Sequence, residues 1–192
     1  MIRNFHLADL FTIANGACGI TAIFHAMKYL RTENLIQIYV ACGLVPLAIV
    51  FDFLDGRVAR WRHEASPLGR EMDSLADVVS FGIAPATIAY SMGLSTLLDQ
   101  IVLVYFAACG LSRLARYNVT AESLSGPTGK VKYFEGTPIT FSLIPLGILL
   151  FLFVRGLPAP MIIVGLPFHP ISAMFFVSGS FMISKTLHIP KP

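Results

Sequence analysis

Long apolar runs alternate with polar, turn-rich segments along the chain. Six of these runs approach or exceed the length of about 20 helical residues that crosses the hydrocarbon core of a bilayer. They occupy residues 10–27, 35–54, 74–93, 98–115, 138–154 and 160–183, and the two largest polar segments are 56–72 and 113–137. The pattern predicts an all-α, polytopic membrane protein, with six transmembrane helices in a single domain over residues 1–192.

The composition agrees with this fold class. Of the 192 residues, 55% are hydrophobic and 13% are charged, whereas soluble domains contain about 25% charged residues. The mean hydropathy is +0.71, so a soluble globular fold is excluded.

Cys18, Cys42 and Cys109 show no metal-binding or disulfide spacing and are expected to pack in the core. The net charge of +3 is small, and no nucleic-acid partner is expected.

Lysine and arginine are spread unevenly over the polar segments. If six helices cross the bilayer, both termini and both large polar segments lie on one side, and that side carries eleven of the 14 lysines and arginines. The other side carries Lys28, Arg31 and Arg155. Because basic residues concentrate on the cytosolic side of membrane proteins, we expect both termini to be cytosolic.

Four aspartates flank the first large polar segment, at the cytosolic ends of the second and third runs. Asp52 and Asp55 are three residues apart, and Asp73 and Asp77 are four apart, so each pair shares one helical face. A charged side chain at the centre of a bilayer costs roughly 2.5–3.5 kcal/mol or more, so such residues usually mark functional sites. If the two helices lie side by side, the four carboxylates converge and need counter-charge.

The surrounding residues favour a metal-assisted phosphate site. Gly56, Pro67 and Gly69 are expected to turn the chain between the two pairs, and the two glycines together with the small Ala59 let a ligand approach the backbone. Arg60 can pair with a phosphate. Oxygen ligands favour Mg²⁺ or Mn²⁺, with Ca²⁺ as another occupant, and two ions about 3.5–4 Å apart commonly clamp a phosphoryl group. Ordinary solvated ion pairs are the expectation for four neighbouring residues, namely Arg57, Arg62, Glu64 and Glu71.

The spacing D-x2-D-G-x2-A-R-x8-G-x3-D-x3-D, from Asp52 to Asp77, resembles the signature of the CDP-alcohol phosphotransferase family. The resemblance implies an integral membrane enzyme with six transmembrane helices, usually a homodimer. Such an enzyme moves a phosphatidyl or phosphoalcohol group from a CDP-linked donor to an acceptor hydroxyl and releases CMP.

Three further segments resemble one group of enzymes within the family. "SLADVVSFGIAPA" (74–86), "CGLSRLARYNVT" (109–120) and "KYFEGTPI" (132–139) are similar to family members that join CDP-diacylglycerol to L-serine, and both ends of the chain resemble the fungal form. That form implies the endoplasmic reticulum membrane, with the active site facing the cytosol. The sequence departs from it in lacking a long polar N-terminal extension and in carrying Thr140 where proline is expected.

The resemblance also implies residue roles. Asp52, Asp55 and Asp73 would hold one metal ion, and Asp77 would contact a second ion and act as the base. The implied binding residues for the CDP moiety are Asp52, Gly56, Ala59, Arg60, Gly69, Asp73 and Asn15. For Asn15 an interhelical hydrogen bond beside Gly16 and Gly19 is an equal alternative.

An acceptor or phosphate site is expected at Arg113, Arg116, Lys132 and Glu135. For the two arginines the alternative is a positive-inside anchor. Gly82 and Pro85 are expected to kink the third span. Two other functions stay open at this point. One is a sibling transferase that uses inositol or glycerol 3-phosphate as the acceptor, and the other is a divalent-cation transporter, which would place acidic residues nearer the midplane of several spans.

Overall fold

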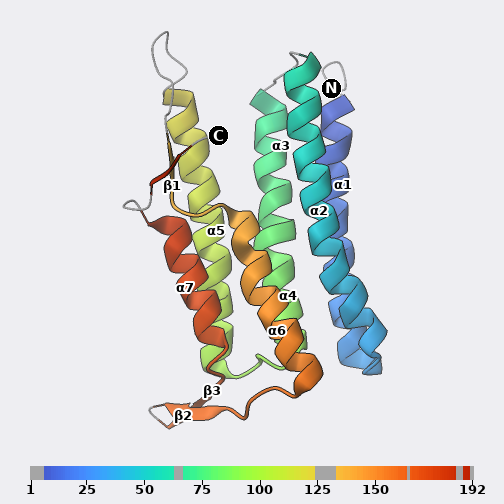
Figure 1. Cartoon of the computed structure of the whole chain (residues 1–192), viewed down its shortest axis with the longest axis vertical. Helices are drawn as coiled ribbons and strands as arrows, with labels where there is room; N and C mark the ends of the chain where they lie inside the picture. Colours follow the sequence, from blue (N-terminus) through green and yellow to red (C-terminus); the bar gives the residue numbers. More distant parts are fainter. Residues whose placement is uncertain (1–6, 63–66, 124–132, 164, 185–187, 191–192) are drawn as a thin grey trace. The chain divides into compact units, whose positions relative to one another are not determined.

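The computed structural model in Figure 1 describes residues 7–62, 67–123, 133–163, 165–184 and 188–190. Helices dominate these residues, so the fold is all-α. Four helical segments are long and apolar enough to cross a membrane, and they are Ala8–Thr32, Leu35–Val58, Leu68–Ser91 and Leu97–Val119. Two shorter apolar helices, Ile139–Arg155 and Ser172–Ile183, overlap the other two predicted spans. The chain forms two compact units, residues 1–88 and 89–192, which are described separately.

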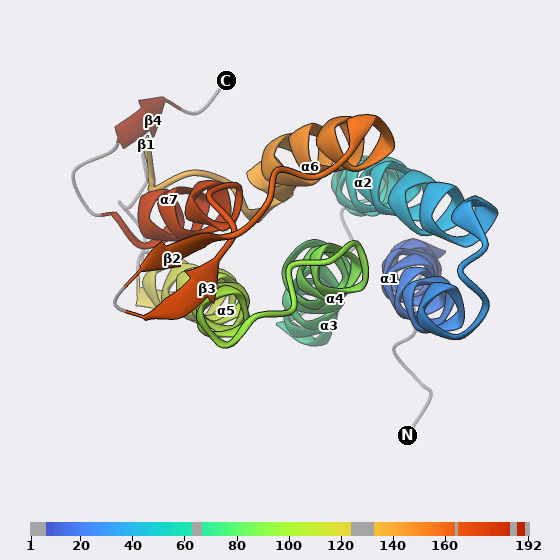
Figure 2. The same ribbon diagram turned by 90° about the horizontal axis from the view of Figure 1, so that it is seen from below.

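The first unit is built on a helical hairpin of α1 (Leu7–Thr32) and α2 (Leu35–Arg62), which lie side by side in Figures 1 and 2. The turn between them is short because Asn34 caps α2. Its Oδ1 accepts a hydrogen bond of 3.0 Å from the backbone N–H of Ile36, as an N-cap side chain does. Glu33 takes the positive φ of 52° that the reversal requires.

Next to α1 lies a helical run that changes its winding. It consists of α3 (Pro67–Asp77), a π-helical turn (Val78–Ile83) and α4 (Ala84–Ser91). The sequence predicts a kink at Gly82 and Pro85, and the structure has a π-helical turn that ends at Ile83, two residues before Pro85. A proline has no N–H to donate to the preceding turn, and a π-helical turn accommodates the local disruption.

Two glycines bring α1 very close to this run. A Cβ on Gly19 would lie 2.6 Å from the Oγ of Ser80 and 2.7 Å from its Cα, and a Cβ on Gly16 would lie 3.5 Å from the Cβ of Ala76. Any larger residue at position 19 would therefore separate the helices. Small residues on a helix face commonly permit such an approach in membrane proteins.

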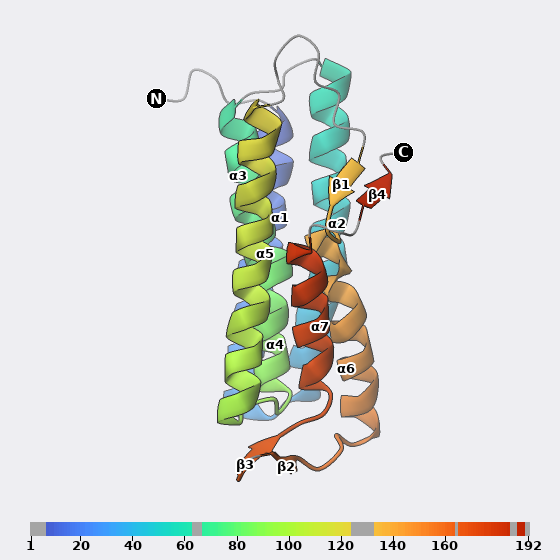
Figure 3. The same cartoon turned by 90° about the vertical axis from the view of Figure 1, so that its left-hand side faces the viewer.

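The second unit is centred on α5 (Leu97–Ser123) and α7 (Ser172–Ile183), which pack along each other in Figures 1 and 3. Phe106 and Phe175 meet edge to face with ring centroids 5.4 Å apart, a favoured aromatic geometry. Gly179 allows the close contact, because its Cβ would lie 3.2 Å from the Cα of Phe106. A 3-10 turn (Ile139–Ser142) leads into α6 (Leu143–Arg155).

A buried carboxylate ties one end of this unit together. Asp99 is fully buried and accepts a hydrogen bond of 2.7 Å from the hydroxyl of Thr96, the residue before α5. Ser172, at the start of α7, donates to the other carboxylate oxygen at 2.5 Å. His169 contributes its backbone N–H at 3.1 Å and its Nδ1 at 2.7 Å. Asp99 thus joins the beginnings of α5 and α7.

Short strands occupy part of a segment that the apolar pattern assigns to the sixth span. The prediction begins that span at residue 160, but β2 (Met161–Ile163) and β3 (Leu166–Phe168) form a hairpin there and α7 begins only at Ser172. Pro160, Pro167 and Pro170 explain the difference, because proline removes the backbone donor that a helix interior needs. A pattern of apolar residues alone does not reveal this effect of proline.

The polar segment between the aspartate pairs is also more helical than expected. Gly56 lies inside α2 and Gly69 lies inside α3, so neither glycine makes the turn. Pro67 is the first residue of α3, where its fixed φ suits the first helical turn. One glycine costs a helix only about 1 kcal/mol, which the surrounding residues of α2 can offset.

Candidate active site

Three of the four signature aspartates come together in the first unit. Asp52 and Asp55 lie in α2, and Asp73 lies in α3. Each offers a carboxylate oxygen, and these three oxygens lie within 4.8 Å of one another. Asp55 is buried, and the other two are half-buried. Like charges this close repel strongly in a poorly solvated site, so the arrangement calls for a cation.

The donor set fits a hard metal ion. All three side chains offer oxygen, which Mg²⁺, Mn²⁺ and Ca²⁺ prefer and zinc does not require. In the part of the chain that the structure describes, the Oδ1 atom of Asp73 is buried and has no hydrogen-bond partner. Because a buried carboxylate oxygen without a partner is costly, this atom is suited to a metal bond. The group can therefore hold a metal ion.

Asp77 lies outside the group of three, at the last position of α3. It is 8% exposed, and its Oδ1 accepts a hydrogen bond of 2.9 Å from the Nδ2 of Asn15 in α1. The structure thus separates the four aspartates into a three-carboxylate group and a fourth carboxylate that an amide orients.

Two polar residues of the site are not singled out by the sequence analysis. The hydroxyl of Thr12 donates to Asp55 Oδ2 at 2.8 Å, and the hydroxyl of Ser80 donates to the backbone carbonyl of Asn15 at 2.9 Å. A spacing signal exists for both. Thr12 lies three residues before Asn15 and Ser80 lies three residues after Asp77, so each shares a helical face with a residue that the sequence does single out.

The remaining signature residues are distributed over α2 and α3. A Cβ on Gly56 would meet no atom within 4 Å, so open space lies beside α2 at that point. Ala59 and Arg60 follow in the same helix, and Gly69 lies in α3. The side chains of Ala59 and Arg60 lie outside the described residues.

The residues expected to bind the acceptor belong to the second unit. Arg113 and Arg116 lie in α5, and both are half-buried. The Nη1 of Arg116 donates to the carbonyl oxygen of Ile183 at 3.1 Å, so this arginine caps the last residue of α7. Lys132 lies outside the described residues, whereas Glu135 is part of β1 (Tyr133–Glu135).

The segment after β1 reaches the same helix end. β1 pairs with β4 (His188–Pro190), and Gly136 follows with a φ of 76°. A Cβ on Gly136 would collide with the carbonyl oxygen of Met182, so glycine is required there. The backbone N–H of Thr137 donates to the carbonyl of Phe181 at 3.2 Å. The "RLARYN" and "FEGTPI" segments, although distant in sequence, therefore converge on the end of α7.

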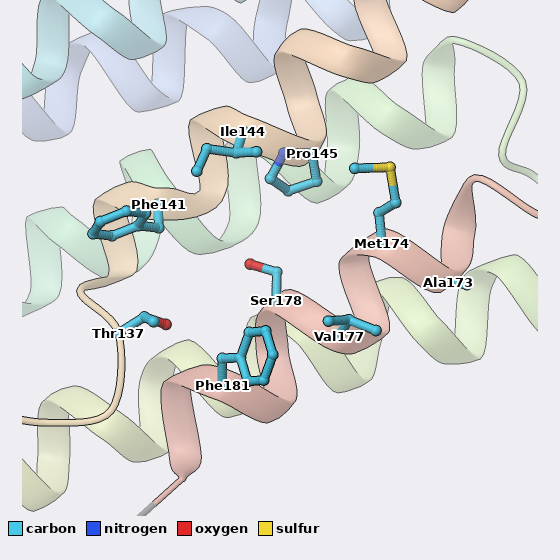
Figure 4. A pocket seen from close by; sticks show the side chains of 9 residues that line it. All are labelled: Thr137, Phe141, Ile144, Pro145, Ala173, Met174, Val177, Ser178 and Phe181. Carbon is cyan, nitrogen blue, oxygen red and sulfur yellow. The ribbon is translucent and has the colours of Figure 1, made fainter. Parts of the chain in front are cut away.

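An apolar groove lies between α6 and α7 in the second unit (Figure 4). Its volume is about 370 Å³, and its walls include Phe141, Pro145 and Phe181, with the hydroxyls of Thr137 and Ser178 as the polar side-chain groups. Its lining is therefore predominantly apolar.

The chain resembles known proteins of one family. The model of the CDP-alcohol phosphatidyltransferase family matches residues 5–177. The chain is 44% identical over its whole length to the CDP-diacylglycerol–serine O-phosphatidyltransferase of Saccharomyces cerevisiae, of which it covers 73%. It is 36% identical to the enzyme of that name from Bacillus subtilis, over 71% of each chain. The Helicobacter pylori enzyme is 39% identical over 68% of this chain and 51% of its own. With the aspartate signature intact, the protein belongs to the CDP-alcohol phosphatidyltransferase family.

Proposed function

We propose that the protein is a CDP-diacylglycerol–serine O-phosphatidyltransferase. It transfers the phosphatidyl group from CDP-diacylglycerol to the hydroxyl of L-serine and releases CMP. The observation that carries this function is the group of three carboxylates at Asp52, Asp55 and Asp73, in a chain that resembles one enzyme of this name along its whole length. Family membership argues against the divalent-cation transporter, and the names of the relatives favour serine over inositol and glycerol 3-phosphate.

The three carboxylates would hold a divalent cation, Mg²⁺ or Mn²⁺, with Ca²⁺ as another occupant. A second ion would contact Asp77. Bound there, divalent cations offset the negative charge that develops on the phosphates as CMP leaves. The support is the all-oxygen donor set, together with the buried, unpartnered oxygen of Asp73.

Asp77 would act as the general base. The serine hydroxyl oxygen forms a bond to the phosphatidyl phosphorus, the bond from that phosphorus to the CMP oxygen breaks, and the hydroxyl proton passes to Asp77. A serine hydroxyl is a weak nucleophile and needs a base within hydrogen-bond reach. Asn15 occupies one oxygen of Asp77, which leaves the other for the incoming hydroxyl.

The CDP moiety would bind along the exposed side of α2 and α3. Its proposed contacts are Asp52, Gly56, Ala59, Arg60, Gly69 and Asp73. The open space beside Gly56 supports this placement, because a nucleotide can approach the helix backbone there. Arg60 would pair with the pyrophosphate through its two parallel donors.

The acceptor or phosphate site would include Arg113, Arg116, Lys132 and Glu135. Its support is the convergence of "RLARYN" and "FEGTPI" on the end of α7, which gives these two segments a common location. Arg113 and Arg116 both remain candidates for reading the serine carboxylate, and Arg116 also holds the carbonyl of Ile183.

In the membrane, we infer six crossings in a single domain, with both termini and the active site on the cytosolic side. The short helices α6 and α7 would complete the fifth and sixth crossings together with their flanking segments. The uneven distribution of lysine and arginine supports this orientation. A location in the endoplasmic reticulum membrane and a homodimeric state follow from the resemblance to the fungal form.

The decisive experiment measures CMP release by the purified protein in detergent. CDP-diacylglycerol is supplied with Mn²⁺ and with serine, inositol or glycerol 3-phosphate in parallel. Release that depends on serine supports the proposal, and the lipid product is verified as phosphatidylserine. Release with inositol or glycerol 3-phosphate in place of serine would assign the protein to a sibling activity.

A further inference from the structure

One face of α1 contacts two different carboxylates of the site. Thr12 and Asn15 are three residues apart, so their side chains point in similar directions. Thr12 donates to Asp55, a member of the three-carboxylate group, and Asn15 donates to Asp77, which lies outside it. A single helix thus contacts the proposed metal ligands and the proposed base through separate hydrogen bonds.

Both donors are buried, and each is hydrogen-bonded to a carboxylate. Thr12 is 4% exposed and Asn15 is 0% exposed. The amide nitrogen of Asn15 is committed to Asp77. Both residues therefore act on the reaction through the carboxylates that they hold.

Contacts with Ser80 also restrain the position of α1 around Asn15 and Gly19. Ser80 donates to the backbone carbonyl of Asn15 at 2.9 Å, and Gly19 lets Ser80 approach α1 at a distance that a Cβ would prevent. Ser80 lies in the π-helical turn that begins directly after Asp77. The carbonyl of Asn15 and its side chain are thus tied to the same short stretch that carries the proposed base.

We propose that Thr12 and Asn15 are positioning residues with separable effects: Thr12 sets Asp55 for metal binding, and Asn15 sets Asp77 for proton transfer. The inference rests on the proposed function, because it assigns its two effects to the two steps of that reaction. Its physical basis is repulsion among four nearby carboxylates, which would turn each one away from its neighbours unless a donor held it. Loss of such supporting hydrogen bonds typically costs about 10–100-fold in metal affinity or activity.

The test compares Thr12→Val and Asn15→Ala with Thr21→Val, an exposed position on the same helix. Two quantities are measured on each purified variant. Mn²⁺ binding is measured by electron paramagnetic resonance of the free ion in the absence of substrate, and kcat and KM are measured by CMP release. Thr21→Val controls for substitution within α1.

For Thr12→Val we expect Mn²⁺ affinity to fall about 10–100-fold, with a loss of activity that added Mn²⁺ recovers. For Asn15→Ala we expect kcat to fall about 10–100-fold at saturating Mn²⁺. Its KM values and Mn²⁺ affinity should match those of the unsubstituted protein. Ser80→Ala provides a milder second variant. It removes the hydrogen bond to the Asn15 carbonyl but keeps the side chains of Asn15 and Asp77. It should lower kcat in the same way and by less.

The outcomes separate the hypotheses. If Asn15→Ala leaves kcat intact and raises KM for CDP-diacylglycerol, Asn15 contacts the nucleotide and the positioning role is wrong. If Thr12→Val and Asn15→Ala change Mn²⁺ affinity alike, the two effects are not separable. Should Asn15→Ala not fold, an unchanged kcat in Ser80→Ala overturns the inference. If the unsubstituted protein releases no CMP, the proposed function fails, whereas an unchanged Mn²⁺ affinity in Thr12→Val refutes the metal half independently.

Discussion

Asp77→Asn isolates the proposed base, because it changes the chemistry of one side chain and almost nothing of its shape. The side-chain oxygen that remains after the substitution can still accept the hydrogen bond from Asn15. The substitution also removes one negative charge from a poorly solvated site that holds three other carboxylates. We therefore expect no loss of thermal stability, since repulsion within the site decreases.

The expected effect on turnover follows from the role of a general base. Such a group typically contributes about 10²–10⁴-fold to the rate, which corresponds to about 3–5 kcal/mol of transition-state stabilisation. Because Asp77 lies outside the group of three carboxylates, the first metal site should remain. The loss should accordingly appear in kcat, with little change in KM for CDP-diacylglycerol.

The assay is steady-state CMP release with each substrate varied in turn, accompanied by a thermal unfolding curve. Glu71→Gln is the matched control, because it makes the same carboxylate-to-amide change at an exposed position of the same helix. Near-normal kcat in Asp77→Asn would remove this residue from the mechanism. A loss of activity that accompanies unfolding, or that occurs equally in Glu71→Gln, would also refute the reasoning.

Three further predictions concern other parts of the molecule. Chelation with EDTA should abolish CMP release and Mn²⁺ should restore it, but Asp55→Ala should prevent the recovery, and full activity in chelator would contradict the carboxylate site. Arg113→Lys should raise KM for serine far more than KM for CDP-diacylglycerol, because lysine keeps the charge but lacks two parallel donors; an unchanged serine KM would place carboxylate recognition elsewhere. Asp99→Ala should lower the free energy of unfolding by about 3–5 kcal/mol, because His169 and its neighbours lose a buried partner; an unchanged unfolding midpoint would show that Asp99 is not a structural link.

Much of the site can be predicted from the order of residues along the chain. The spacing of Asp52, Asp55, Asp73 and Asp77 is a property of helical periodicity, since residues three or four apart share a face in any α-helix. The structure brings three of them together as a helix pair would. The predicted family is confirmed, and the matched relatives are enzymes of the predicted class.

The predicted helix bounds are wrong at positions where proline or glycine was weighed incorrectly. The apolar segment that begins at residue 160 contains three prolines before Ser172, and it forms a hairpin before α7 starts. Conversely, Gly56 and Gly69 are expected to break the chain, but both lie within helices. A proline removes a backbone donor, whereas a glycine only weakens a helix, so the first decides local structure more strongly than the second.

The sequence alone determined the membrane class, the aspartate signature and the family, because these depend on composition and on spacing along one chain. Only the tertiary structure decided which side chains hold which carboxylates. Thr12 meets Asp55 and Asn15 meets Asp77 across 43 and 62 residues, and Arg116 meets the end of α7 across 67. The physical reason is that a hydrogen bond needs its two atoms within about 3 Å, and for residues this far apart only the packing of helices sets that distance.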